Sequence, residues 1–539
     1  MSVVASVFRS KSLGVRSSGL LIRASVLTFT LFCIILPALS IFLRISPDGI
    51  AQALSSGQLP AAIRNTLVSA SLTASISVVI GFFGSMVMNR VDMRFKGVLS
   101  VLFLLPMLIP SISHAFGLVS LFGKNGFFVR LLRLNVSIYG MSGIVAGSVM
   151  YSFPVAFLMI SSVLRQEDYT PHEAAYVMGI GPFRRFFALT WPHVRKTLLS
   201  VFLAVFTMAA TDYGVPLMIG GKTITLSVLM YNKAVSLLDY SSGSVIGVLL
   251  IVPAIAAFIA DLLCPESAVR SFQTRSFPPD DDIRTKALSY AFCFILAVIV
   301  VVPIASFALM SFSADYPSNM SFTFHHVLKT IDRGGIRFLF NSVSYALFAA
   351  VFGTVLSFVS AYVTSRGKGV TAKFLHLSIL ISMAVPGMFL GLAYVIFFNK
   401  SIIYGTFLIV GLVNIVHFMS SPYLMMYNTL GKVNPNLEDA GLVLGIGRFR
   451  IVIDVIVPKV RSTLLEIFAY YFINSMMTIS AVSFLAPPAP KPLSLMINQF
   501  ESQLLMESAA FVSILILVVN SCIKIVCDRL AHGRTVESF

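Results

Sequence analysis

The stretch that decides the fold of this 539-residue chain occurs twice. Residues 173–181 read EAAYVMGIG, and residues 439–447, one offset of 266 later, read DAGLVLGIG. The same offset relates three more pairs, Phe183 and Phe449, Pro192 and Pro458, and Arg195 and Arg461. Both copies are short polar segments between long apolar runs, and this pattern predicts two equivalent loops in a duplicated protein.

The composition indicates a membrane protein. Hydrophobic residues make up 57% of the chain and charged residues only 11%, whereas soluble domains carry about 25% charged residues. Apolar runs of about 20 residues are long enough to span a bilayer as helices. We therefore predict an all-α, polytopic membrane protein with about 12 transmembrane helices.

The apolar runs give the expected spans and their orientation. Lys and Arg avoid translocated loops, and with both termini in the cytoplasm the inner segments hold 27 of the 39 basic residues. Because the basic residues gather in the inner segments, we interpret the net charge of +17 as a sign of membrane topology and not of a nucleic-acid-binding surface. The spans are expected near 24–44, 65–88, 96–122, 141–163, 198–218, 244–263, 287–311, 341–364, 374–398, 403–428, 464–485 and 508–527.

The repeat extends over the whole chain. Asn65 and Arg90 bracket the second span, and Asn341 and Arg366 bracket the eighth at an offset of 276. We predict a first half over 1–264, a cytosolic linker over 265–286 and a second half over 287–539. Six spans in each half cross the membrane in the same sense, so an axis along the membrane normal should relate the halves.

Each repeated loop reads as a short helix with a defined end. In the first repeat loop (171–196), Pro171 suits a first helical turn, and Glu173 there is favourable against the helix dipole. Gly179 and Gly181 are expected to end the helix, because glycine accepts the left-handed conformation. The second repeat loop (435–461) has the same design. An amphipathic helix lying in the lipid interface is the alternative interpretation.

The first loop resembles the EAA loop of binding-protein-dependent ABC importer permeases, whose pattern is E-A-A-x-x-x-G followed by a proline. Glu173, Ala174, Ala175, Gly179 and Pro192 match that pattern. The second loop departs from it at Asp439 and Gly441, and Gly441 should weaken its helix by up to about 1 kcal/mol. The resemblance implies that both loops contact the ATPase, through Glu173, Ala174, Ala175, Gly179, Gly181, Asp439, Ala440, Gly445 and Gly447.

A fused permease of two such halves is similar to the ferric-iron-type permeases of bacteria, which have the MetI-like fold. The resemblance implies an inner-membrane transport subunit that is not itself an enzyme and needs no cofactor. Its implied partners are a homodimer of ATP-binding cassette subunits, a periplasmic solute-binding protein and the lipid bilayer. Ferric iron is the expected solute, and phosphonate or another phosphate-bearing solute is the alternative.

Few polar residues suggest a pathway through the membrane. Asp212, next to Tyr213, stands near the end of the fifth span, where a buried charge is a functional hypothesis; an external turn is the competing interpretation. The repeat counterpart of Asp212 is Thr478, and Ser480 lies two residues further along the chain. The sequence shows no catalytic triad and no metal motif. Gly221-Lys222-Thr223 lacks the first glycine of a phosphate-binding loop.

Two other classes of protein remain open on these grounds. An ion-coupled secondary transporter would need intramembrane carboxylates, for which Asp212 is the single candidate. A membrane scaffold would leave the duplicated loop without a role.

Overall fold

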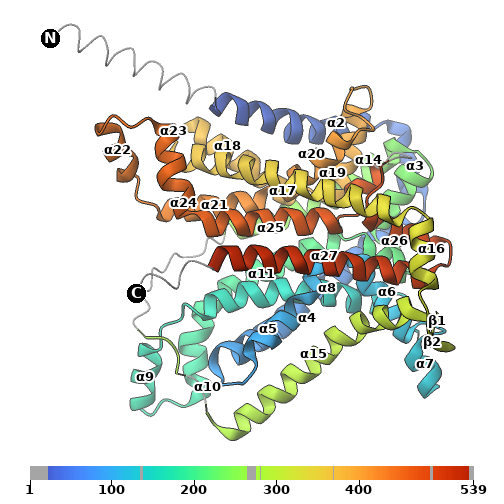
Figure 1. Ribbon diagram of the computed structural model, residues 1–539, viewed down its shortest axis with the longest axis horizontal. Helices are drawn as coiled ribbons and strands as arrows, with labels where there is room; N and C mark the ends of the chain where they lie inside the picture. The colour runs from blue at the N-terminus through green and yellow to red at the C-terminus, as the bar shows by residue number, and fades with distance from the viewer. Residues whose placement is uncertain are drawn as a thin grey trace. The chain divides into compact units, whose positions relative to one another are not determined.

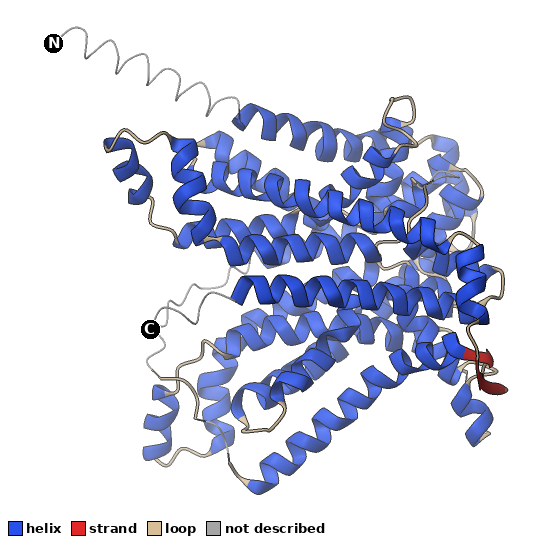
Figure 2. Ribbon diagram, in the orientation of Figure 1, coloured by secondary structure: helices blue, strands red, loops and turns tan. Residues whose placement is uncertain are grey.

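The computed structural model describes residues 22–133, 137–263, 275–278, 281–367, 369–485 and 490–532. These residues are almost entirely helical, with one short hairpin of strands β1 (Ser313–Asp315) and β2 (Asn319–Phe322) (Figure 2). The all-α prediction is confirmed. Residues 265–274, 279 and 280 of the expected linker lie outside the described residues.

The described residues contain nine helices that are long and apolar enough to cross a membrane, and eleven spans if two bent helix pairs each count as one. The bent pairs lie where the sequence predicts spans 374–398 and 403–428. The expected span 464–485 is helical only to Met477. The nine helices are Ile22–Arg44, Leu59–Arg90, Ser111–Leu132, Met141–Leu164, Pro182–Thr211, Tyr240–Ala260, Ile283–Phe312, Gly335–Arg366 and Met506–Ala531.

The chain forms two compact units. The N unit comprises Ser46–Gly335 and Ser494–Leu517, and the C unit comprises Met1–Ile45, Ile336–Leu493 and Val518–Phe539.

The N unit is built from most of the first half of the sequence (Figure 1). Its helices are α3 (Pro47–Ser55), α4 (Leu59–Arg90), α5 (Lys96–Leu104), η2 (Leu105–Leu108), α6 (Ser111–Phe122), α7 (Phe127–Leu132), α8 (Met141–Leu164), α9 (Thr170–Val177), α10 (Pro182–Arg185), η3 (Phe186–Thr190), α11 (Trp191–Thr211), α12 (Gly214–Ile219), α13 (Leu226–Tyr231), η4 (Asn232–Ser236), α14 (Tyr240–Leu263), α15 (Ile283–Phe312), α16 (His325–Asp332) and most of α26 (Leu493–Ser502).

The C unit is built from most of the second half, and α27 (Met506–His532) is divided between the units at Leu517. Its other elements are η1 (Leu31–Ile35), α2 (Leu36–Arg44), α17 (Gly335–Arg366), α18 (Val370–Ala384), α19 (Gly387–Phe398), α20 (Phe407–Phe418), α21 (Ser420–Lys432), α22 (Asn436–Val443), α23 (Arg448–Ile451), η5 (Val452–Ile456), α24 (Val457–Lys459), α25 (Arg461–Met477) and η6 (Val482–Phe484).

Small residues let the long helices of each unit approach closely, as is usual between membrane helices. In the N unit, a Cβ at Gly81 of α4 would lie 2.9 Å from the Cβ of Ala156 in α8. In the C unit, a Cβ at Gly353 of α17 would lie 2.7 Å from the ring of Tyr471 in α25. The Tyr471 hydroxyl also shares a 2.8 Å hydrogen bond with Ser357.

The first long helix of each half packs within the unit built mainly by the other half. In the C unit, the Tyr394 hydroxyl of α19 donates to the Cys33 carbonyl of η1 at 2.7 Å. In the N unit, Ser306 of α15 shares a 2.8 Å hydrogen bond with Ser120 of α6. Each compact unit therefore contains the first long helix of the sequence half that mainly forms the other unit.

The repeat is visible in the helix boundaries. Helices α4 and α17 both have 32 residues and end at Arg90 and Arg366. Helices α6 and α19 both have 12 residues and begin directly after Pro110 and Pro386. A single span over 96–122 is not observed, because proline disfavours helical geometry at the residue before it and Ile109 is extended.

Candidate functional site

The first repeat loop forms a short helix with a closed C-terminal end. Helix α9 is followed by Gly179 at φ +72°, a conformation that glycine adopts at little cost. The Ile180 amide donates to the Ala175 carbonyl at 3.0 Å, as in a Schellman motif. The chain then continues through α10 and the π-helical turn η3 into α11.

The second repeat loop has the same geometry. Helix α22 ends before Gly445 at φ +75°, and the Ile446 amide donates to the Gly441 carbonyl at 2.9 Å. Helix α23 and the π-helical turn η5 follow, at the offset of 266 from α10 and η3. In Figure 1, α9 and α10 lie beyond the end of α11 in their unit, and α22 and α23 lie beyond the end of α25 in theirs. The expected helix ends at both glycines are confirmed in the backbone.

Both repeat loops expose apolar side chains at equivalent positions. In the first loop Val177, Met178 and Phe183 are 81%, 69% and 78% exposed. In the second loop the equivalent Val443, Leu444 and Phe449 are 88%, 77% and 80% exposed. We call these two sets the apolar patches. A polar loop that repeats an exposed apolar patch has the composition of a docking surface.

The remaining predicted coupling residues lie on or beside these patches. Ala174 and Ala440 are exposed, whereas Ala175 and Gly441 face the inside of their loops and are buried. At Gly181 and Gly447, an added Cβ would meet nothing within 4 Å. These two glycines therefore leave bare backbone next to the apolar patch, which permits the close approach of another chain.

The departure of the second loop at Gly441 has a steric cause. A Cβ at Gly441 would lie 2.6 Å from Cδ1 of Ile451 in α23. The first loop has Ala175 and Arg185 at the equivalent positions. The larger side chain at 451 is thus accommodated by the smaller residue at 441, and this packing offsets part of the weaker helix propensity.

An ion pair fixes the first loop to the end of α4. Arg90 Nη2 lies 2.5 Å from Glu167 Oε2, and the Glu167 carboxylate also bonds His172 Nε2 and Thr190 Oγ1, each at 2.9 Å. Burial alone would raise the pKa of Glu167, but the hydrogen bond with His172, the charge of Arg90 and the hydrogen bond from Thr190 together lower it. Glu167 is therefore held ionised beside Arg90.

A second ion pair fixes the second loop to the end of α17. Arg366 Nε donates to Glu438 Oε1 at 2.7 Å, and its Nη2 donates to the Val433 carbonyl at 3.0 Å. The Tyr362 hydroxyl donates to Glu438 Oε2 at 2.7 Å. Both glutamate oxygens are thus bonded to the last two turns of α17.

A piece of the chain between the two halves clasps the first loop. The Tyr169 amide donates to the Arg275 carbonyl at 2.9 Å, and the Arg275 guanidinium donates to both oxygens of Glu173 at 2.7 and 2.9 Å. The Phe277 ring lies 4.9 Å from His172 and 5.1 Å from Tyr169 between centroids. The guanidinium of Arg90 lies 4.1 Å from the Phe277 ring centre. We call residues 275–278 the clasp.

The residues expected to line a pathway occupy equivalent breaks. Asp212 follows α11 and Thr478 follows α25, with φ and ψ of −66° and 135° and of −63° and 133°. Asp212 Oδ2 accepts from the Val215 amide at 3.0 Å, so the carboxylate caps α12. Tyr213 is buried, and a Cβ at Gly387 would lie 2.4 Å from the Ser480 hydroxyl oxygen. All four residues thus lie in the non-helical breaks after α11 and α25.

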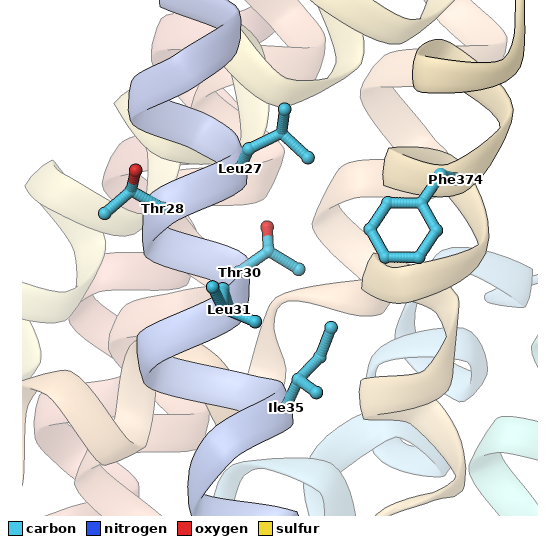
Figure 3. Close-up of a pocket in the computed structure, with 6 residues that line it drawn as sticks. All are labelled: Leu27, Thr28, Thr30, Leu31, Ile35 and Phe374. Carbon is cyan, nitrogen blue, oxygen red and sulfur yellow. The ribbon is translucent and has the colours of Figure 1, made fainter.

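A hollow of about 170 Å³ lies between the first long helix and α18 (Figure 3). Its lining is Leu27, Thr28, Thr30, Leu31, Ile35 and Phe374. The Thr30 hydroxyl is already donated to the Val26 carbonyl at 2.8 Å. The hollow offers no charged group, so it suits an acyl chain better than a charged solute.

The residues that hold the loops in place do not stand out in the sequence. Glu167, Glu438, Arg275 and Phe277 match no motif, and Arg90 and Arg366 are visible only as markers of the repeat. The signal that the sequence carries for these contacts is an arginine at the same end of two equivalent helices, α4 and α17. It does not reveal which acid each arginine meets.

The family model of the binding-protein-dependent transport system inner membrane component matches residues 77–264 and 353–535. The chain therefore belongs to this family of membrane permeases and is a transport subunit of an ABC importer in the bacterial inner membrane, not an enzyme. The expected resemblance is confirmed.

Relatives extend over most of the chain. A protein of Haemophilus influenzae assigned as ferric transport system permease FbpB 1 is 24% identical over 85% of this chain and 77% of its own length. The ferric transport system permease protein FbpB of Actinobacillus pleuropneumoniae is 23% identical over 93% and 76%. A protein of Helicosporidium assigned as sulfate transport permease is 25% identical over 44% of this chain and 91% of its own.

Proposed function

We propose that this chain supplies both halves of the pore of an importer for ferric iron. Two ATP-binding subunits of one kind dock on the two repeat loops, and a periplasmic binding protein delivers the solute to the opposite face. Nucleotide binding moves α9 and α22 and switches access to the pore. The observation that carries this proposal is the repeated apolar patch, exposed at three equivalent positions in each loop.

The proposed topology agrees with this arrangement. Both termini lie in the cytoplasm, because that orientation puts most Lys and Arg residues inside. Both repeat loops are then cytoplasmic and meet the ATPase. Glu173, Ala174, Gly179 and Gly181 border the first docking surface, and Asp439, Ala440, Gly445 and Gly447 border the second.

The choice of ferric iron follows from the relatives that match most of the chain. The two pathway segments around Asp212 and Thr478 are proposed to face the translocation route. A phosphate-bearing anion is the second candidate, since the relative named for sulfate transport handles a tetrahedral oxyanion.

The docking surface is tested by a charge placed in each patch. We expect Val177→Asp combined with Val443→Asp to abolish co-purification of the ATPase, because docking would bury an unpaired carboxylate in each apolar patch, which is strongly unfavourable. Ile402, which is 97% exposed in the turn between α19 and α20, provides the control Ile402→Asp. Unchanged ATPase binding in the double variant would refute the docking assignment.

A further inference from the structure

Each half of the chain carries a charged link at the same structural point. The last residue of a 32-residue helix, Arg90 or Arg366, pairs with a glutamate next to or within the short loop helix. The side chains are mostly out of solvent, at 20% and 5% exposed for Arg90 and Glu167 and at 17% and 13% for Arg366 and Glu438.

The two links are built from non-equivalent glutamates. At the offset of 266, Glu167 corresponds to Val433, and Glu438 corresponds to His172. Both pairs of positions nevertheless take part in both links. In the first half Glu167 bonds Arg90 and His172; in the second half Val433 and Glu438 each accept a hydrogen bond from Arg366.

Because the two glutamates occupy non-equivalent positions, the two links are not copies of one residue pair. The glutamate stands at a different position in each half, and the contact between the helix end and the loop is present in both. Ion pairs removed from water are costly to form and strongly destabilising to break. A charged link kept at this point in both halves therefore suggests a mechanical requirement rather than stability alone.

The helices that receive the links lead into the packed part of each unit. Helix α4 packs through Gly81 on α8, and α17 packs through Gly353 on α25. A displacement of α9 or α22 would act on these long helices through the arginine side chains. A guanidinium that bonds two groups at once constrains orientation as well as distance.

We propose that Arg90 and Arg366 are positioning residues that carry the movement of each loop helix to the second long helix of its own half. The inference rests on the proposed function, because the movement originates in the docked ATPase. Each arginine keeps the loop helix and the long helix moving as one body.

The test uses the full chain with its ATPase in proteoliposomes, with ferric iron supplied on the binding protein. We expect Arg366→Gln to keep ATPase co-purification and ATP hydrolysis but to lower the iron moved per ATP by about tenfold, a coupling effect of ordinary size. The swap Arg366→Glu with Glu438→Arg should restore most of the ratio. The control is Arg450→Gln, which removes the exposed Arg450–Asp454 pair of the same loop and should leave the ratio unchanged.

An unchanged ratio in Arg366→Gln, or a swap that restores assembly without the ratio, would overturn the proposal. A second measurement needs neither solute nor ATPase: a nitroxide at Val443→Cys in a variant without native cysteines. Its spectrum should sharpen in Arg366→Gln and broaden again in the swap; a spectrum indifferent to both would also overturn the proposal. Failure of the unaltered chain to bind an ATPase would instead refute the proposed function.

Discussion

The two repeat loops share a backbone but differ in what holds them. Each has a helix of eight residues, a glycine near φ +72° or +75°, an exposed apolar patch and an arginine link. The first is in addition clasped by residues 275–278 through Arg275 and Phe277. In the described part of the chain, Asp439 has no ion pair of the kind that joins Glu173 to Arg275.

The two loops therefore reach the same backbone geometry through different contacts. The clasp lies in the segment that joins the halves, so it occurs once in the chain. The second loop instead has the close contact of Gly441 with Ile451. The clasp thus holds the first loop, and the packing of Gly441 against Ile451 holds the second loop in the same backbone geometry.

The strongest test of this difference is a larger side chain at 441. We expect Gly441→Leu to destabilise the second loop by about 1–3 kcal/mol, as overpacking usually does, because a Cβ at 441 would lie only 2.6 Å from Cδ1 of Ile451. Hydrogen exchange of the α22 amides is the measurement.

The same variant has two matched controls. Ala175→Leu in the first loop, where the long and flexible Arg185 stands at the position equivalent to Ile451, should cost less. Ile451→Ala should rescue Gly441→Leu by making room. A rescue that fails would show that the strain arises elsewhere.

Removal of the clasp should affect only the first loop. We expect Phe277→Ala to speed exchange of the α9 amides by about 10- to 150-fold, since it removes two ring contacts and one cation–π contact worth about 0.5–1 kcal/mol each. The α22 amides should not change. Phe127→Ala, which removes a ring contact with Phe128 at 5.4 Å, serves as the control, and equal acceleration in both loops would contradict the comparison.

Acid should release the first loop only at low pH. The pKa of Glu167 lies below its usual value of 4.5, so its contribution to stability is complete above that value and is lost as the pH falls through the lowered pKa. A nitroxide at Val177→Cys should therefore stay immobile down to about pH 4.5 and become mobile below it.

Two variants test whether the Glu167 carboxyl is the group that titrates at this site. Glu167→Gln should mobilise the label already at neutral pH, and His172→Gln should keep the acid transition of the carboxyl. A transition that disappears in His172→Gln would contradict the assignment of the pH dependence to the Glu167 carboxyl.

Much of the fold followed from the sequence because membrane helices obey strong local constraints. Apolar length identifies spans, and Gly179 and Gly445 ended their helices where the pattern predicted. The breaks before Pro110 and Pro386 were harder to predict from the sequence, since a proline within an apolar run can either kink a helix or end it. Which acid each arginine meets could not be predicted, because Glu167 and Glu438 do not occupy equivalent positions.

The sequence by itself determined the membrane setting, the duplication, the family and the two loop helices, because these depend on composition and on local repeats. Only the tertiary structure showed that the first helix of each half packs with the other half, that residues 275–278 clasp one loop, and that two different glutamates meet matched arginines. Such contacts join positions far apart in the chain, and side-chain reach and packing in three dimensions decide them rather than any periodic pattern.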